Sequence, residues 1–209
     1  MIDLRQVVLG NPSRLRFIIR FSNCPRIHNE SVSDHSFYVA LYAYYISMDL
    51  IFAKGYSSLD LGKVLSKALV HDMDECFSGD MIRMFKYSDP ILKMEVNKAC
   101  ETFMSMLSSD IAESYVRDSI YADWFESKNE REGSIVAFAD YLSVLSYIHQ
   151  EIDLGNHRME RQVPELKKFH GYFREEKFEF LKEYIDTAGE ILNEIDECIK
   201  ERKNGSRKV

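Results

Sequence analysis

Residues 64–75 read VLSKALVHDMDE, and this stretch indicates both the fold and a site. Its apolar residues recur at the spacing of one helix face, which predicts a helix with one buried side. His71 and Asp72 follow the apolar run directly, where two polar side chains are unexpected. Neighbouring helical residues point about 100° apart, so one ion seated between these side chains could contact both. If the helix continues, Glu75 lies on the same side as His71.

Helical periodicity also marks other long segments of the chain. Only four prolines occur in the 209 residues, and the nine glycines never cluster, so long helices are permitted nearly everywhere. Strand signals are weak by comparison. We therefore predict an all-α fold in which segment 10–33 is the least regular. The expected helices cover residues 39–50, 61–69, 91–107, 111–125, 135–148 and 164–201, the last with a potential break near Gly171.

Cap-forming residues indicate where these helices begin and end. Serine and aspartate side chains accept hydrogen bonds from the first N–H groups of a helix, so we expect N-caps at residues 57–58 and 109–110. Glycine is favoured just past a helix C-terminus, which predicts that helices end near Gly55 and Gly155.

The composition excludes several classes of protein. Apolar residues make up 45% of the chain and charged residues 29%, a balance typical of a globular domain rather than a disordered or fibrous chain. With 27 Lys and Arg against 34 Asp and Glu, the net charge is -7, so we expect no non-specific attraction to nucleic acid or to an anionic membrane. The last ten residues hold five basic side chains and one acidic side chain, which we interpret as a solvated end.

Cysteine spacing and hydropathy predict the cellular compartment. Cys24, Cys76, Cys100 and Cys198 are too far apart for a CxxC site, and no secretory start is recognisable, so we expect reduced thiols in the cytoplasm. The most apolar stretch, residues 41–53, is interrupted by polar residues. It falls short of the ~20 residues that a membrane-spanning helix requires.

Two further residues join His71 and Asp72 as candidate metal ligands. His35 is expected early in one helix, and Asp140 lies in the middle of another apolar helix. Burying a carboxylate without compensation costs several kcal/mol, so a cation, an arginine or a helix end should lie beside Asp140. A single helical histidine is more often a core or surface residue than a ligand, and only the combination favours a metal site. We interpret the remaining histidines as surface or structural residues: His28, His149, His157 and His170.

The order of these residues resembles a known enzyme family. The relevant runs are Arg20–Phe21, ESVSDHS at 30–36, ALVHD at 68–72 with Glu75, SGD at 78–80, and AD at 139–140 with Leu142. They resemble the HD-domain phosphohydrolases, specifically the YfbR-like 5′-deoxynucleotidases, over about residues 14–156. The resemblance implies an HD-domain helical bundle at residues 1–160, followed by a helical C-terminal extension with a basic tail at 161–209.

The resemblance also implies a set of metal ligands with open positions for water and a phosphate oxygen. These ligands are His35, His71, Asp72 and Asp140. Two histidines and two carboxylates form a mixed nitrogen and oxygen set. Such a set suits Co²⁺, Mn²⁺, Zn²⁺ or Fe²⁺ better than Mg²⁺.

Other positions take substrate-binding and catalytic roles by the same resemblance. Arg20 would bind the phosphate with its planar guanidinium, and Phe21, where relatives usually have Trp, would stack on the base or sugar. Glu75 would position or deprotonate the attacking water. Asp80 would orient the nucleophile or protonate the leaving 5′-oxygen. Lys86 would add a second phosphate contact.

One loop departs from the family pattern. Relatives typically continue after the Gly-Asp pair with a loop containing Pro and Thr, whereas this chain has MIRMFK at residues 81–86. The loop is more basic, and Arg83 could meet additional phosphates. Arg83 could equally be an exposed arginine on an amphipathic turn.

The predicted activity is hydrolysis of a deoxyribonucleoside 5′-monophosphate to nucleoside and phosphate. The alternative on the same site is a deoxynucleoside triphosphohydrolase that releases triphosphate, and hydrolysis of a cyclic dinucleotide or an alarmone is more distant. A non-catalytic module with a structural metal is a different class. Arg20, Glu75 and Asp80 argue against it, because a structural site needs only its ligands.

Self-association is also implied, since relatives are commonly homodimers. Three tyrosines of one helix, Tyr42, Tyr44 and Tyr45, could form an interface. They could equally belong to the core, which is the commoner place for such residues.

Overall fold

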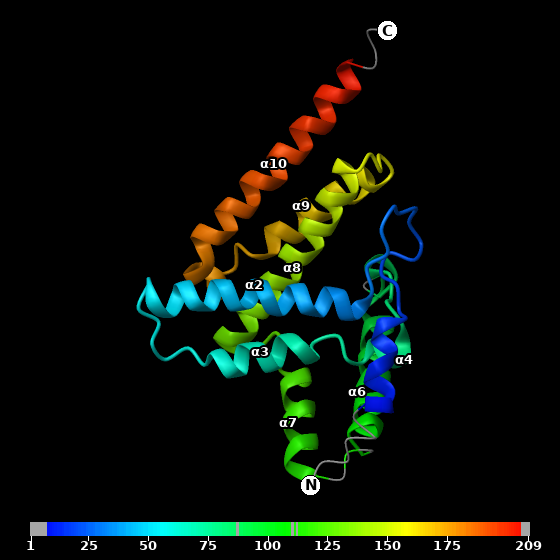
Figure 1. Cartoon of the computed structure of the whole chain (residues 1–209), viewed down its shortest axis with the longest axis vertical. Helices are drawn as coiled ribbons and strands as arrows, with labels where there is room; N and C mark the ends of the chain where they lie inside the picture. Colours follow the sequence, from blue (N-terminus) through cyan, green and yellow to red (C-terminus); the bar gives the residue numbers. More distant parts are fainter. Residues whose placement is uncertain (1–7, 87, 110, 112, 206–209) are drawn as a thin grey trace. The chain divides into compact units, whose positions relative to one another are not determined.

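The computed structural model describes residues 8–86, 88–109, 111 and 113–205, without the side chains of residues 83, 84, 108 and 109. Over these ranges the chain is helical (Figure 1), and its only extended pairing is an isolated antiparallel bridge between Ile19 and Ser31. The predicted all-α fold is therefore confirmed. The helices are η1 Asn11–Arg16, α2 Val32–Phe52, α3 Leu61–Val70, α4 Glu75–Ser78, α5 Arg83–Lys86, α6 Pro90–Ser109, α7 Ser114–Phe125, α8 Glu130–Asp153, η2 Met159–Gln162, α9 Val163–Tyr172, η3 Glu176–Leu181 and α10 Lys182–Gly205.

Two of the predicted N-caps are wrong. The residue that caps α3 is Asp60, whose Oδ1 accepts from the Lys63 N–H at 3.0 Å, rather than the serines at 57–58. Ser109 is the last residue of α6, and α7 begins only at Ser114. Asp110 lies outside the described residues.

The predicted helix ends near Gly55 and Gly155 are confirmed. Gly55 and Gly155 adopt φ values of 77° and 92°, the left-handed conformation that glycine tolerates just past a helix. The segment from residue 164 to 201 does break, as predicted. The break lies between Tyr172 and Lys182, where a 3-10 turn joins α9 to α10.

The chain forms two compact units. One comprises residues 1–23 and 29–139, and the other comprises residues 24–28 and 140–209. Helix α8 runs through residue 140, so the division falls inside a helix and ahead of residue 160. The predicted boundary at residue 160, between an HD-domain core and a C-terminal extension, stays a prediction.

The first unit is built on α2 and α3, which pack side by side (Figure 1). Helix α7 packs on α3 and also on α6, while η1 contacts α2 and α4. A buried cluster joins Leu15 of η1, Val32 of α2, Cys76 of α4 and Met104 of α6. This cluster fixes the first turn of α2 relative to the segment that follows α3, where the site residues lie.

A buried lysine connects α3 to the chain beyond α7. Lys67 has no exposed surface, and its Nζ donates to the carbonyl oxygens of Glu126 at 2.9 Å and Asn129 at 3.3 Å. These carbonyls follow the C-terminus of α7, where a positive charge is favourable. Lys67 therefore stabilises the packing of α7 on α3.

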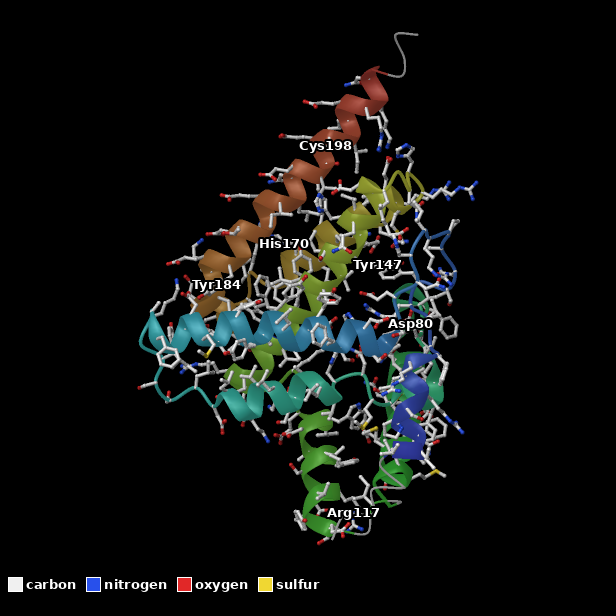
Figure 2. The ribbon with its side chains drawn as sticks, in the orientation of Figure 1. Asp80, Arg117, Tyr147, His170, Tyr184 and Cys198 are labelled. Atoms are coloured by element: carbon white, nitrogen blue, oxygen red, sulfur yellow. The ribbon has the colours of Figure 1, made fainter. Side chains whose placement is uncertain are left out.

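The second unit has an aromatic core and a buried carboxylate. Tyr141, Phe169, Phe173 and Phe178 pack with ring centroids about 5 Å apart. Glu151, only 1% exposed, accepts hydrogen bonds from three donors. They are the N–H groups of Ile27 at 2.8 Å and His28 at 2.7 Å and the Nδ2 of Asn156 at 2.6 Å. Tyr147 of α8 is labelled in Figure 2. Its hydroxyl donates to the backbone carbonyl oxygen of His28 at 2.7 Å. Loop 24–28 is thus fixed to α8.

The described part of the basic C-terminal segment is largely solvent-exposed, as predicted, but it is helical and ion-paired rather than frayed. Both carboxylate oxygens of Glu160, a residue of η2, are engaged by α10. Arg202 pairs with one oxygen, and Lys203 Nζ lies 3.0 Å from the other. Residues 206–209 lie outside the described residues.

Two findings bear on the predicted compartment. All four cysteines are free thiols. No helix in the described part of the chain is long and apolar enough to cross a membrane. The cytoplasmic location stays a prediction.

Candidate active site

The site begins where α3 ends. His71 is the C-cap residue of α3, and its buried ring places Nδ1 2.8 Å from the carbonyl oxygen of Ala68. A carbonyl can only accept a hydrogen bond, so Nδ1 must carry the proton. Nε2 then presents a lone pair, which is the form in which histidine binds a metal.

His35 enters the same place from α2. The helix begins with a capping box, in which Ser31 Oγ accepts from the Asp34 N–H at 3.1 Å and Asp34 Oδ2 accepts from the Ser31 N–H at 3.0 Å. This start sets the first turn, so the fully buried His35 projects from α2 toward the end of α3. The ring centroids of His35 and His71 lie 5.4 Å apart.

Asp72 completes a group of three donors. Its Oδ2 lies 3.0 Å from Nε2 of His71 and 3.5 Å from Nε2 of His35. One ligand atom from each of these residues lies within 4.8 Å of the others. Two imidazole nitrogens and one carboxylate oxygen directed at one point fit a divalent transition metal ion.

Asp140 is the fourth predicted ligand. It is a buried residue of α8 and is 9% exposed. It belongs to the second unit, whereas the other three belong to the first. Its place among the ligands stays a prediction.

Glu75, at the start of α4, lies among other carboxylates. Burial and the negative charges of Asp72 and Asp80 raise the pKa of Glu75 to about 10, and the Arg20 guanidinium offsets only part of this rise. Oε2 of Glu75 is enclosed without a hydrogen-bond partner in the described part of the structure. The site is rich in negative charge, and a cation would relieve the repulsion.

Arg20, Phe21 and Asp80 form a second part of the site. The Phe21 N–H donates to Oδ2 of Asp80 at 3.0 Å, and the Arg20 guanidinium lies 5.5 Å from the centre of the Phe21 ring. Phe21 has a φ of 53°, a conformation uncommon for a bulky residue. Asp80 thus holds an unusual turn at the aromatic residue that we predict to contact the base or sugar.

The basic loop residues stay predictions. Lys86 is half-buried at the end of α5, and the side chain of Arg83 lies outside the described residues.

Two acidic residues were missed by the sequence reasoning. Glu30, 7% exposed, accepts a hydrogen bond from Nη1 of Arg20 at 2.9 Å. Asp74 is also buried and accepts from Nε1 of Trp124 at 2.9 Å. Glu30 belongs to the motif that precedes His35, which places it near the site but does not indicate what it does. Nothing in the sequence distinguishes Asp74 from a surface carboxylate.

Comparison with known proteins gives consistent matches. A family model described as 5′-deoxynucleotidase YfbR-like matches residues 9–188. The chain is 27% identical to the 5′-deoxynucleotidase YfbR of Salmonella arizonae over 188 residues, which are 88% of this chain and 93% of that protein. It is also 27% identical to the 5′-deoxynucleotidase VV1113 of Vibrio vulnificus over 174 residues, 75% of this chain and 87% of that protein.

A solved structure shares the fold. An HD-domain phosphohydrolase from Listeria innocua aligns with a TM-score of 0.73 and 22% identity, covering 92% of this chain and 98% of that chain. This likeness confirms the predicted HD-domain helical fold.

Proposed function

The chain belongs to the YfbR-like 5′-deoxynucleotidase family, and on that premise we propose that it hydrolyses deoxyribonucleoside 5′-monophosphates to nucleoside and phosphate. Membership in this family of hydrolases confirms the resemblance inferred from the motifs. The observation that supports the reaction most directly is the convergence of His35, His71 and Asp72 on one point. Arg20 lies close enough to this group to interact electrostatically with it. The charges of Arg20 and Asp72 both act on the Glu75 carboxyl, in opposite directions.

A divalent metal ion fits these donors. His35, His71 and Asp72 would hold it, with Asp140 as the proposed fourth ligand. The mixed donor set favours Co²⁺, Mn²⁺, Zn²⁺ or Fe²⁺ over Mg²⁺. When bound, such an ion supplies Lewis acidity, which lowers the pKa of a water molecule and neutralises charge on phosphoryl oxygens.

Arg20, Phe21 and Lys86 are proposed to bind the substrate. A guanidinium matches two phosphate oxygens with its planar pair of donors, and Arg20 is held in place by Glu30. The Phe21 ring offers an apolar surface for the base or sugar. Lys86 would supply a second positive charge to the phosphate.

Glu75 and Asp80 are proposed to handle protons. Glu75 would orient the attacking water and accept its proton at a carboxylate oxygen, which requires a positive charge nearby to lower its raised pKa. Asp80 would orient the nucleophile or protonate the leaving 5′-oxygen. Its bond to the Phe21 N–H ties it to the substrate-binding turn.

The test is product analysis on a substrate panel. Protein stripped of metal and then supplied with Co²⁺, Mn²⁺, Zn²⁺ or Mg²⁺ is assayed for orthophosphate and triphosphate from dNMPs, NMPs and dNTPs. Orthophosphate from dNMPs that depends on a transition metal supports the proposal. Triphosphate from a dNTP would instead establish the triphosphohydrolase. Inertness toward the whole panel would overturn both.

We further propose that the chain forms a homodimer through α2. Tyr44 and Tyr45 are exposed, at 37% and 60%, so they do not belong to the core. Phe37 and Phe52 on the same helix are 60% and 77% exposed. Exposed aromatic surface of this kind is typical of interaction sites. Tyr45→Asp should convert a dimer to a monomer in light scattering, and a wild-type monomer would overturn the proposal.

A further inference from the structure

Glu30 contacts the Arg20 side chain directly. Arg20 and Glu30 are 9% and 7% exposed, and Nη1 of Arg20 donates to Oε2 of Glu30 at 2.9 Å. Two charged residues are rarely enclosed this way without a specific interaction.

The backbone already holds the two segments together without this ion pair. The backbone N–H of Arg20 donates to the backbone carbonyl oxygen of Glu30 at 2.9 Å. The backbone N–H of Val32 donates to the backbone carbonyl oxygen of Ile18, also at 2.9 Å. These bonds flank the bridge between Ile19 and Ser31. The Glu30 carboxylate therefore adds little to joining the segments, and its specific effect is on the guanidinium.

A fixed guanidinium binds phosphate better than a mobile one. An arginine on the surface loses rotamer freedom when it engages an anion, which weakens binding. A bond from Nη1 to a buried carboxylate sets the plane of the group before the ligand arrives. The guanidinium is rigid and planar, so fixing one N–H group also fixes the directions of the other N–H groups.

The cost of keeping Glu30 ionised also indicates a role. Burial raises the pKa of Glu30 to about 7 despite the attraction of Arg20, and the charges of Asp34 and Asp80 contribute to the rise. A neutral glutamine could accept the same hydrogen bond at lower cost. It would not attract the guanidinium by charge.

We propose that Glu30 is a positioning residue that orients the Arg20 guanidinium toward the phosphate group of the substrate. This inference rests on the proposed function, in which Arg20 binds that phosphate. Glu30 itself does not touch the reacting atoms in this account. Its whole effect on turnover passes through Arg20.

A double-mutant cycle tests this dependence. Glu30→Gln, Arg20→Ala and the double variant are compared by kcat/KM for a dNMP and by the inhibition constant of inorganic phosphate. In the wild-type background Glu30→Gln should lower kcat/KM and weaken phosphate inhibition by roughly tenfold to a hundredfold. In the Arg20→Ala background the same change should alter kcat/KM by less than about twofold. Arg20→Lys replaces Arg20→Ala if the latter is too slow to measure.

Metal content and a second ion pair, whose carboxylate is buried, serve as controls. Each variant should bind the same amount of metal as the wild type, which shows that the fold and the histidine site are intact. Asp123→Asn removes the buried carboxylate partner of Lys63, 2.5 Å away, and should leave phosphate inhibition unchanged. An equal effect of Glu30→Gln in both backgrounds, or an effect under about twofold in the wild type, would overturn the positioning role.

Failure of the proposed function would look different. If the wild type releases no phosphate from any dNMP, that function is wrong. Calorimetric titration of the metal-loaded protein with inorganic phosphate then still compares Glu30→Gln with the wild type. Equal affinities would overturn the positioning role, and a weaker affinity in the variant would support it.

Discussion

Nε2 of His71 lies 3.0 Å from Oδ2 of Asp72, although the two residues are neighbours in sequence. Adjacent residues of a continuous helix point in different directions, but α3 ends at Val70 and a turn follows before α4. The turn brings both side chains to one point. The Nδ1 bond from His71 to the Ala68 oxygen then fixes which nitrogen faces that point.

Loss of a donor should therefore abolish metal binding. His71→Ala removes a buried nitrogen ligand, and we expect the purified variant to retain far less metal than the wild type when both are measured by elemental analysis. His149→Ala is the matched control, because this half-buried histidine of α8 is not one of the proposed ligands and its Nε2 lies 3.5 Å from Oδ2 of Asp153. Equal metal content in His71→Ala and the wild type would contradict the assignment of the site.

Glu75 should be required for turnover but not for metal binding. Glu75→Gln keeps the size of the side chain and removes its ability to accept a proton. We expect kcat to fall by about 100-fold to 10,000-fold, the usual contribution of general base catalysis, with metal content unchanged. Glu95→Gln on the exposed face of α6 is the control. A near-native rate in Glu75→Gln would remove Glu75 from the mechanism.

Glu30 should make the protein less stable as the pH rises. Its pKa is raised by burial from 4.5 to about 7 in the presence of Arg20, Asp34 and Asp80. Between these values the folded protein keeps a proton that the unfolded chain releases, so the free energy of unfolding falls with increasing pH. The decline due to this group is about 3 kcal/mol.

Urea unfolding at pH 4.5 and pH 7.5 measures this effect. The decline in the free energy of unfolding should be smaller in Glu30→Gln than in the wild type, because glutamine does not titrate. Other groups contribute equally to both proteins. An identical decline in the two proteins would show that Glu30 has an ordinary pKa.

Lys67 should stabilise the first unit through its charge and its hydrogen bonds. Lys67→Met retains most of the packing volume but leaves the carbonyl oxygens of Glu126 and Asn129 without this donor. We expect the free energy of unfolding to fall by about 1–3 kcal/mol. Lys98→Met, an exposed change on α6, should have an effect within about 0.5 kcal/mol. Similar stability of Lys67→Met and the wild type would contradict the role of the buried ammonium group.

The helices were predictable because their periodicity is strong and prolines are rare. Asp60 was missed as the N-cap of α3 because Ser57, Ser58 and Asp60 are all good caps. Only the path of the chain after Gly55 decides among them. Lys67 was missed for a different reason: its partners lie 59 and 62 residues away. A lysine on an otherwise apolar helix is normally interpreted as exposed.

The structure brings His35, His71 and Asp72 together, whereas the predicted roles of Asp140, Lys86 and Arg83 stay predictions. The apolar settings of His35 and His71, together with the family resemblance, indicated metal ligands. The tautomer of His71 and the role of Glu30 depend on tertiary contacts. The left-handed backbone of Phe21 depends on its bond to Asp80. No local pattern reports such contacts.

A metal titration of activity shows directly whether the metal site drives hydrolysis. Metal-stripped protein is mixed with increasing Co²⁺ or Mn²⁺, and orthophosphate release from a dNMP is followed. We expect no release without metal and a rate that saturates as one site per chain fills. Equal release by the stripped protein, or no release from any dNMP at saturating metal, would contradict it.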